Sequence, residues 1–307
     1  MSSPGNRRVD QGVTVVIPTI GRSELRRAVD TALAQSIPPF QVIVVADTAD
    51  QIDVPESPSV RVLRVGPRAG GNVARQQGIY AAETAYVALL DDDDEWLPNH
   101  LANFAELVRS SGHSEDSDWI FSSPVIARYS DGASDEVWPS EAISRAESIA
   151  QYLFRKHKVR GGIGFAQAST LVFPRSLGIE IPFNPGFKFH QDVGWLNQIS
   201  KDMPEVELLQ PAEPAVIHHI SAGGVSKSIT APKSIAWAVE NLDPEDKRTI
   251  GDFISVHSMQ AAKNQASLNE MFRTLRTAHK LGKPGIPSTI YSVALTGRVA
   301  LGKIGRH

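Results

Sequence analysis

The stretch "YVALLDDDDEWLP", Tyr86 to Pro98, runs from five largely apolar residues straight into four aspartates. Acidic runs usually form solvated loops. This one differs, because an uninterrupted apolar segment precedes it and Trp96 and Leu97 follow it. Such a short apolar segment is typical of a strand that is buried on both faces of a parallel sheet. We therefore expect Asp91 to Asp94 at the carboxyl end of a buried strand, where such sheets bind their ligands.

Apolar strands and helical patterns alternate on both sides of this stretch. Buried strands are expected at 13–19 and 41–47 and a more exposed one at 60–65, with helices over 23–33, over 72–83 and from Pro98 onward. Ser23 is the expected N-cap of the first helix. This alternation predicts an α/β fold in which a mostly parallel sheet is flanked by helices. Asp47 then lies at a strand end, on the same edge as the aspartate run.

The second half of the chain is less regular and ends in helices. One strand is expected in 118–130, an amphipathic helix in 141–158 and a strand at 215–219. From Pro232 the pattern is mostly helical, and residues 271–307 hold seven Lys or Arg residues without one Asp or Glu. These shifts predict a flexible N-terminus (1–12), two halves of one domain (13–115 and 116–230) and a basic helical extension (231–307).

Composition excludes several classes of protein. The chain has 307 residues, 41% of them hydrophobic and 21% charged, which is ordinary for a globular protein. A net charge of −3 argues against a nucleic-acid partner. The absence of cysteine excludes disulfides, thiol catalysis and cysteine-bound zinc, and suits the cytoplasm. The first twelve residues lack the apolar core of a signal peptide, and no apolar run reaches the length of a membrane span.

The aspartate run has the chemistry of a cation site. Carboxylate oxygens are the natural ligands of Mg²⁺ and Mn²⁺. Asp91 and Asp93 are separated by one residue, and alternate residues of an extended chain face the same way. The alternative is a charged surface loop. A calcium-binding EF-hand is excluded, because its loop needs a central glycine and a glutamate at position 12.

Five segments of the chain resemble family 2 glycosyltransferases. They are "VTVVIPTIGR", "VIVVAD", "AGGNVARQQGI", "YVALLDDDDEWLP" and "HQDVGWL", in the order found in that family and within about residues 12–225. The resemblance implies an inverting enzyme with the A-type glycosyltransferase (Rossmann-like) fold, with the nucleotide sugar bound by 13–115 and the acceptor by 116–230. It also implies Mn²⁺ or Mg²⁺, a UDP-, dTDP- or GDP-linked sugar donor and one catalytic carboxylate.

The resemblance assigns roles to residues that bind the donor and the metal. Asp93 and Asp91 would bind the metal, and His219 of the doublet His218-His219 would complete the metal site. Asp94 and Glu95 would cap the next helix and orient the metal site. An alternative for the histidines is a structural role at a strand end. Asp47 follows Ala46 and precedes Thr48, where the family usually has a second aspartate and a glycine. The residues expected to contact the donor nucleotide are Pro18, Thr19, Arg22, Asp47, Arg75, Asp91 and Asp92.

The resemblance places the catalytic base at Asp192. The family has a Glu-Asp pair here, and this chain has Gln191-Asp192. Inversion needs a base that removes the proton of the acceptor hydroxyl. On the residues alone, Asp192 is also a good N-terminal cap for the helix that follows. His190 and Trp195 are the candidate acceptor contacts, with core packing as the alternative for the tryptophan.

Three functions are compared at this point. The first is a metal-dependent inverting glycosyltransferase that moves a sugar to a hydroxyl of a glycan, a lipid-linked or a small-molecule acceptor. The second is a non-catalytic protein that binds sugar nucleotides or carbohydrates on the same fold. The third, a nucleotidyltransferase, usually carries a glycine-rich basic loop after the first strand, and "PTIGRSELRR" has one glycine. The presence of both Asp93 and Asp192 favours the transferase.

The basic C-terminus raises the question of a membrane. Fourteen uncharged residues separate Lys283 from Arg298, too few to span a bilayer but enough to lie in its interface. Such contact at the inner face of the membrane would suit a lipid-linked or cell-envelope acceptor. Wound as a helix, Ile290, Val293 and Leu301 share one side and Leu295 and Val299 the other. A helix that is apolar all round packs against its own domain or a second subunit, so a homo-oligomer is the alternative.

Overall fold

The computed structural model describes residues 12–111, 119–220 and 229–304, with side chains up to Leu301. Residues 1–11 of the predicted flexible N-terminus and the predicted boundary at 115/116 lie outside the described residues. The chain forms two compact units. The first comprises Met1–Trp138, Ala166–Trp195 and Glu205–Ile220, and the second Pro139–Phe165, Leu196–Pro204 and Ser221–His307. The four predicted segments stay a prediction.

A seven-stranded sheet forms the core of the first unit. Its order is β10-β6-β9-β4-β1-β2-β3, and every pairing is parallel except those of β9 with β4 and β6. The mostly parallel α/β sheet is therefore confirmed. The strands are β1 (Val13–Thr19), β2 (Gln41–Ala46), β3 (Val60–Arg64), β4 (Tyr86–Leu89), β6 (Trp119–Ser122), β9 (Leu171–Pro174) and β10 (Glu207–Leu209).

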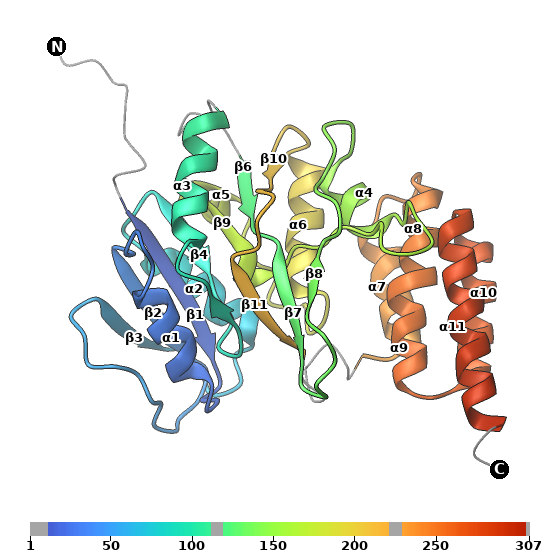
Figure 1. Ribbon diagram of the computed structural model, residues 1–307, viewed down its shortest axis with the longest axis horizontal. Helices are drawn as coiled ribbons and strands as arrows, with labels where there is room; N and C mark the ends of the chain where they lie inside the picture. The colour runs from blue at the N-terminus through green and yellow to red at the C-terminus, as the bar shows by residue number, and fades with distance from the viewer. Residues whose placement is uncertain (1–11, 112–118, 221–228, 305–307) are drawn as a thin grey trace. The chain divides into compact units, whose positions relative to one another are not determined.

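Helices cover both faces of this sheet (Figure 1). On one face Phe104 of α3 (His100–Ser111) packs on Tyr86 of β4, beside α1 (Leu25–Leu33). On the other face α2 (Gly71–Ala81) lies on β1 and contacts α5 (Arg175–Glu180). Gly78 makes that approach possible, because a Cβ there would lie 2.2 Å from Val16.

A second sheet of four strands lies in the same unit. Its order is β5-β11-β7-β8, with bounds Glu95–Trp96, Val216–Ile220, Val125–Tyr129 and Glu136–Trp138. The single strand expected over 118–130 is wrong, because β6 and β7 belong to different sheets. Pro124 separates them and has no N–H to donate to a ladder. In the second sheet β11, which contains His218 and His219, pairs with β7 on one side and with β5 on the other.

Several predicted helix starts are also wrong. The first helix begins at Leu25, and Ser23 donates to the carboxylate of Glu24 instead of capping it. The third begins at His100, where the side chain of Gln35 accepts from the N–H of Leu101. The helix expected over 141–158 is reduced to α4 (Ile149–Phe154), which Ser148 caps.

The second unit contains the predicted helical extension. Its helices are α4, α7 (Ala231–Asn241), α8 (Lys247–Phe253), the π-helix η4 (Ile254–Ser258), α9 (Met259–Asn264), α10 (Leu268–Leu281) and α11 (Ile286–Ile304), and α6 (Gln191–Asp202) continues into it from the first unit. Phe154, Trp237 and Phe253 form its aromatic core, with ring centroids 5.2–6.1 Å apart. Along the described chain, none of the helices combines the length and the apolar character that crossing a bilayer requires.

The sequence suggested that helix α11 is apolar on all sides, and this is wrong. Its buried residues are Ser288, Ser292 and Thr296. The predicted shared side of Ile290, Val293 and Leu301 is present and exposed. Leu295 and Val299 lie on the other side, beside the buried hydroxyl residues, and are half-buried.

His100 makes the folded state sensitive to acid. Its ring is fully buried, with Trp96 stacked on it at 4.3 Å and Phe121 at its edge. Within the described chain neither ring nitrogen has a hydrogen-bond partner. Burial lowers the pKa of His100 from 6.5 to about 3. Between these values the unfolded chain takes up a proton that the folded chain excludes, so the free energy of unfolding falls as the pH falls.

We predict that His100→Leu flattens this acid dependence. Below pH 6.5 the wild-type free energy of unfolding should lose about 1.4 kcal/mol per pH unit more than that of the variant. Urea unfolding of both proteins between pH 7 and pH 5 measures the difference. Parallel pH dependences would contradict a neutral, buried His100.

Candidate active site

The four aspartates lie in a turn directly after β4. The N–H of Asp94 donates to the carbonyl of Asp91 (3.2 Å), and one carboxylate oxygen each from Asp91, Asp93 and Asp94 lies within 4.8 Å of the others. The expected convergence of Asp91 and Asp93 is present, but the expected reason is wrong. The turn, not the alternation of an extended strand, brings the oxygens together, and it adds Asp94 to them.

Arg75 of α2 is the central cation of the site. Its side chain is 7% exposed, and Nη2 lies 2.7 Å from Asp91 and 3.8 Å from Asp192. Nη1 donates to the side-chain oxygen of Gln191 (2.8 Å). Burial raises the pKa of Asp91 to about 7 against the opposing charge of Arg75, and Asp192 and Asp94 raise it further. The predicted neighbourhood of Arg75 and the aspartates is thus present.

Asp92 connects the aspartate turn to the end of β1. Thr19 donates its hydroxyl to Asp92 (2.6 Å). Arg22 donates to Asp92 (2.9 Å) and to Asp93 (2.6 Å). Pro18 pairs with Val45 in the adjacent strand. The loop after β1 and the aspartate turn therefore form one charged surface.

Asp93 and Asp94 differ sharply in exposure. The side chain of Asp93 is 36% exposed and that of Asp94 1%. Asp94 accepts from Ser169 (2.6 Å), from Gln167 (2.9 Å) and from the N–H of His219 (3.1 Å), and His218 Nδ1 lies 3.0 Å away. Of these two carboxylates, Asp93 is the one that a ligand can reach.

The expected capping role of Asp94 and Glu95 is wrong. Asp94 lies six residues before α3 and bonds the groups named above instead, and Glu95 belongs to β5. Burial alone would raise the pKa of Asp94, but its hydrogen bonds with His218 and Ser169 hold the pKa below its ordinary value. Asp94 is a buried anion that joins three segments of the chain.

Segment 167–170 was missed by sequence reasoning. The short helix η2 (Ala168–Thr170) lies before β9, and Ser169 also accepts from the N–H of Asp91 (3.0 Å). The N–H of Ala168 donates to Asp192 (3.0 Å). Small polar residues in a glycine-rich stretch carry no sequence signal for this role.

Asp192 lies in the first turn of α6, as expected. Oδ2 accepts from Ala168, and Oδ1 is the oxygen that lies near Arg75. Its side chain is 19% exposed. The structure therefore brings Asp192 next to Asp91 through the shared cation.

The two histidines contact different carboxylates. His218 lies against Asp94, whereas His219 Nε2 lies 2.5 Å from Glu95, which also pairs with Arg27 at 3.2 Å. The group of mutually close oxygens includes neither histidine. Metal binding by His219 stays a prediction.

Asp47 has a structural task at the end of β2. Both carboxylate oxygens accept backbone N–H groups, from Ala69 and Gly70 at 2.7 Å, which orders the start of α2. Gly66 permits this, because a Cβ there would collide with the Asp47 carboxylate. Contact of Asp47 with a nucleotide stays a prediction.

The two candidate acceptor contacts differ in position. Trp195 is 2% exposed, stacks on Phe183 at 4.6 Å and donates to the carbonyl of Ile181. Trp195 packs with Phe173 and Phe183 in the interior, and a role toward an acceptor would require its ring to become exposed. His190 is half-buried and has a positive φ of 53°, directly before α6.

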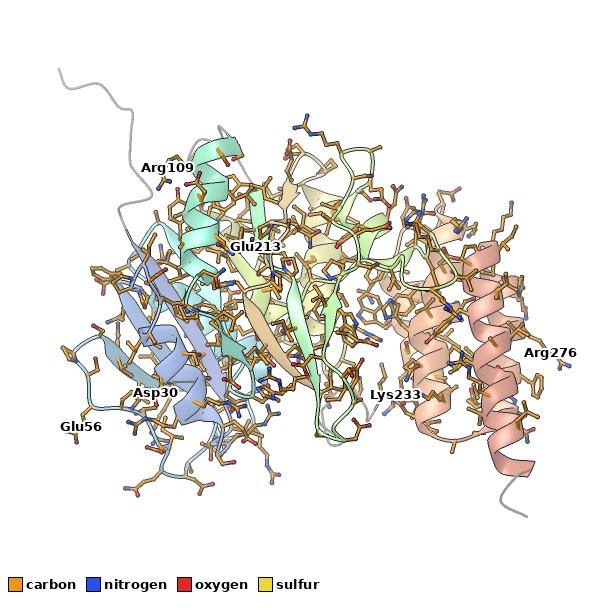
Figure 2. All side chains as sticks on the ribbon, in the orientation of Figure 1. Asp30, Glu56, Arg109, Glu213, Lys233 and Arg276 are labelled. Atoms are coloured by element: carbon orange, nitrogen blue, oxygen red, sulfur yellow. The ribbon has the colours of Figure 1, made fainter. Side chains whose placement is uncertain are left out.

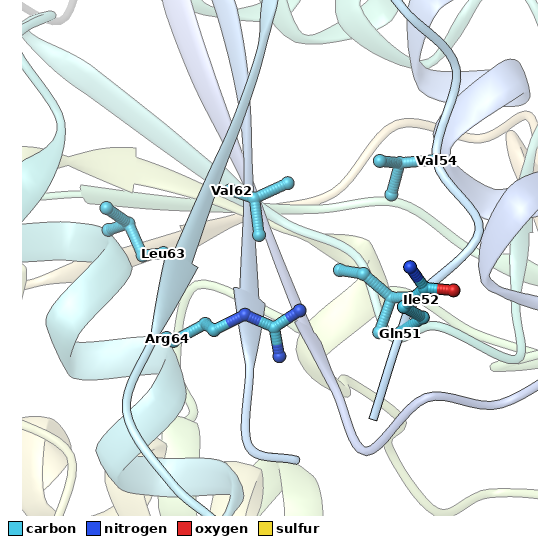
Figure 3. A pocket seen from close by; sticks show the side chains of 6 residues that line it. All are labelled: Gln51, Ile52, Val54, Val62, Leu63 and Arg64. Carbon is cyan, nitrogen blue, oxygen red and sulfur yellow. The ribbon is translucent and has the colours of Figure 1, made fainter. Parts of the chain in front are cut away.

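A pocket of about 780 Å³ lies at the edge strand β3 (Figure 3). Arg64 at its rim donates to the carbonyls of Thr48 and Asp50. No carboxylate contributes to the lining, so this pocket is separate from the aspartate turn. Its lining residues are Gln51, Ile52, Val54, Val62, Leu63 and Arg64.

The family comparison covers the segment that contains the aspartate turn. Residues 14–176 match the family described as "Glycosyl transferase family 2", and the chain belongs to that family. It is a glycosyltransferase with the A-type fold, which confirms the resemblance inferred from the sequence.

The chain is also similar to individual proteins of known name or structure. The chain is 31% identical over 241 residues to amylovoran biosynthesis glycosyltransferase AmsB of Erwinia amylovora, covering 74% of this chain and 77% of that one. It is 26% identical over 167 residues to the putative colanic acid biosynthesis glycosyl transferase WcaA of Escherichia coli, with 51% and 57% covered. The crystal structure of S. aureus TarS 1-349 in complex with UDP-GlcNAc matches with a TM-score of 0.58 at 14% identity, over 95% of this chain and 92% of that one.

We predict that Asp94→Asn destabilises the protein by about 2–4 kcal/mol. The amide would direct two N–H donors toward Ser169 and Gln167, which are themselves donors to Asp94. Asp93→Asn is the matched control in the same turn, with an expected loss of at most about 1 kcal/mol, because an exposed ion pair contributes little. Urea unfolding at pH 7 compares them. Equal losses would mean that Asp94 is not the buried anchor described here.

Proposed function

We propose that this glycosyltransferase uses a divalent metal and a nucleotide-diphosphate sugar, and transfers the sugar to a hydroxyl with inversion. One observation carries the proposal. The Asp91–Asp93–Asp94 oxygens lie within 4.8 Å of one another, and Arg75 connects Asp91 to Asp192. A cation-binding carboxylate set and a separate carboxylate for proton removal are the two requirements of the reaction.

The residues present fit Mg²⁺ or Mn²⁺. The donor set consists of oxygens alone, which these hard cations prefer. Burial, together with the nearby aspartates, raises the pKa of Asp91 despite the charge of Arg75, so a bound cation would favour the ionised form of Asp91. Asp93 and Asp91 would hold the ion, and Asp94, whose oxygens accept from four groups, would keep the turn in place. When bound, the ion would neutralise charge on the departing diphosphate.

The loop after β1 would bind the donor nucleotide. Thr19 and Arg22 contact Asp92 and so lie beside the carboxylates, with Pro18 preceding them. Arg75 and Asp47 border the start of α2, whose N-terminus favours negatively charged groups. The likeness to TarS, solved with UDP-GlcNAc, makes UDP-sugars the first donors to test, ahead of dTDP- and GDP-sugars.

Asp192 would act as the general base. Its Oδ2 is held by the N–H of Ala168, which leaves Oδ1 to receive the proton of the acceptor hydroxyl. Arg75 orients the carboxylate through its contact with Oδ1. Gln191 is neutral and accepts from Arg75, so it adds no further negative charge to the pair of aspartates.

The acceptor is proposed to be a growing cell-envelope or secreted polysaccharide, including a lipid-linked form, handled at the inner face of the membrane. Two relatives are named for the biosynthesis of amylovoran and colanic acid. Half-buried His190 lies beside the proposed base and would contact the acceptor.

Asp93→Ala should abolish metal-dependent binding of a nucleoside diphosphate while the fold is kept. Asp93 is the most accessible member of the cluster, so its loss removes a ligand without opening the core. Calorimetry of UDP binding with and without Mn²⁺ measures this, with circular dichroism as the check on folding. Unchanged Mn²⁺-dependent affinity would overturn the metal assignment.

Asp192→Asn should separate binding from chemistry. Donor affinity should stay near wild type, while transfer falls by about a hundredfold or more, the loss expected for a general base. Steady-state transfer and calorimetry on the same preparation supply both values. A parallel fall in donor affinity would make Asp192 a donor contact, and binding without turnover by the wild-type chain would favour a non-catalytic binding protein.

A further inference from the structure

Helix α11 is packed with its polar side inward. Ser288, Ser292 and Thr296 form its buried stripe. Ser292 donates to the carbonyl of Ser255 in η4 (2.7 Å), and Thr296 donates to the carbonyl of Ser292 (2.8 Å). Small hydroxyl side chains are therefore the fully buried part of the inner side, with half-buried Leu295 and Val299 beside them. A helix on the surface of a soluble domain usually turns its main apolar stripe inward.

The opposite side of α11 is apolar and exposed. Ile286 is 76% exposed, Ile290 43%, Val293 54% and Leu301 71%. At 100° per residue these positions fall within a sector of about 80°, centred about 140° from the hydroxyl stripe. A continuous exposed apolar stripe of this kind marks a surface that another body covers.

Helix α10, next to α11, supplies exposed cations. It lies beside α11, and both helices pack on η4 and α9 (Figure 1). The buried residues of α10 are Met271, Thr274 and Ala278, so its outward side carries exposed Phe272, Arg276 and Lys280. Arg276 projects from that side (Figure 2). From Met271 to the end of the chain there are seven Lys or Arg residues and no acid.

We propose that this α10–α11 surface docks on a bilayer containing anionic phospholipids. The apolar stripe of α11 enters the boundary between headgroups and acyl chains, and the cations of α10 contact the headgroups. With 19 residues, α11 is about 28 Å long and would lie in the plane of the membrane. The inference concerns a surface in the second unit and holds independently of the proposed function.

Charge decides between a membrane and a second copy of the chain. Two copies paired through this surface would bring two strongly basic segments together, because Glu270 is the one acid in the sequence of α10 and α11. Anionic headgroups offer the complementary charge, and polybasic segments beside apolar ones are the usual features of peripheral binding. Dimerisation is therefore the alternative outcome of the test.

Sedimentation of the full chain with vesicles provides the test. The wild-type chain should bind vesicles that contain phosphatidylglycerol, bind phosphatidylcholine vesicles weakly, and lose binding as salt rises. The double substitution Ile290→Gln and Val293→Gln should lower binding by about tenfold or more. Val239→Gln is the matched control, because Val239 is 51% exposed on α7 of the same unit and should leave binding unchanged.

A second pair of variants tests the charge. Arg276→Glu should weaken binding to anionic vesicles, and Lys233→Glu, an exposed lysine on α7, should not (Figure 2). Unchanged thermal unfolding confirms that each variant is folded. Asp192→Asn should bind vesicles as wild type does, so that loss of transfer and loss of membrane binding remain separate results.

Three results would overturn the proposal. The first is no binding of the intact chain to anionic vesicles. The second is binding that the double substitution on α11 leaves unchanged. The third is a dimer in solution, seen by light scattering, that the double substitution dissociates while vesicle binding is absent, which would make this surface a contact between copies of the chain.

Discussion

The buried guanidinium of Arg75 is the interaction on which the active site depends. Asp91 follows a buried strand, and Asp192 begins a helix about a hundred residues later, so these two anions would repel each other without a cation between them. Burial alone would lower the pKa of Arg75, but Asp91 and Asp192 outweigh it and raise that pKa, so the side chain stays charged. Because Arg75 lies on α2, which Gly78 allows to approach β1, the packing of one helix on the sheet sets the distance between the two carboxylates.

The short helix η2 is the second support of the site. Ser169 bonds both Asp91 and Asp94, and Ala168 bonds Asp192. Its position follows from β9, the strand that runs antiparallel to β4 and β6 in the large sheet and begins directly after η2. An antiparallel strand brings its start to the carboxyl end of its parallel neighbours. The antiparallel direction of one strand therefore places two hydrogen-bonding residues, Ala168 and Ser169, at the edge where the aspartates lie.

The proposed catalytic site and the proposed membrane surface lie in different units of the chain. The first unit concentrates carboxylates around Arg22 and Arg75 and buries Asp92 and Asp94, which favours a small, highly charged ligand. The second unit does the reverse on α11, where hydroxyls are buried and apolar side chains are exposed. A transferase whose acceptor is assembled at a membrane would benefit from both, because attachment raises the local concentration of acceptor without any change at the site.

The sequence by itself determined the parts of the fold that depend on local patterns. The apolar strands β1, β2 and β4, the helices between them and the place of Asp91 at a strand end follow from residues near one another in the chain. The nearness of Arg75 and Asp192 to the aspartates came from the resemblance to a family.

Only the tertiary structure decided which groups face each other across long separations. Ser169 and His218 meet Asp94 from 75 and 124 residues away, and no periodicity reports such a pairing. The sequence did not predict the inverted packing of α11, for a related reason. A helical pattern shows which residues share a side, but only the neighbouring helices decide which side is buried. Small hydroxyl side chains allow close packing on η4, and Ser292 and Thr296 donate hydrogen bonds to backbone carbonyls, so the polar side could be the inner one.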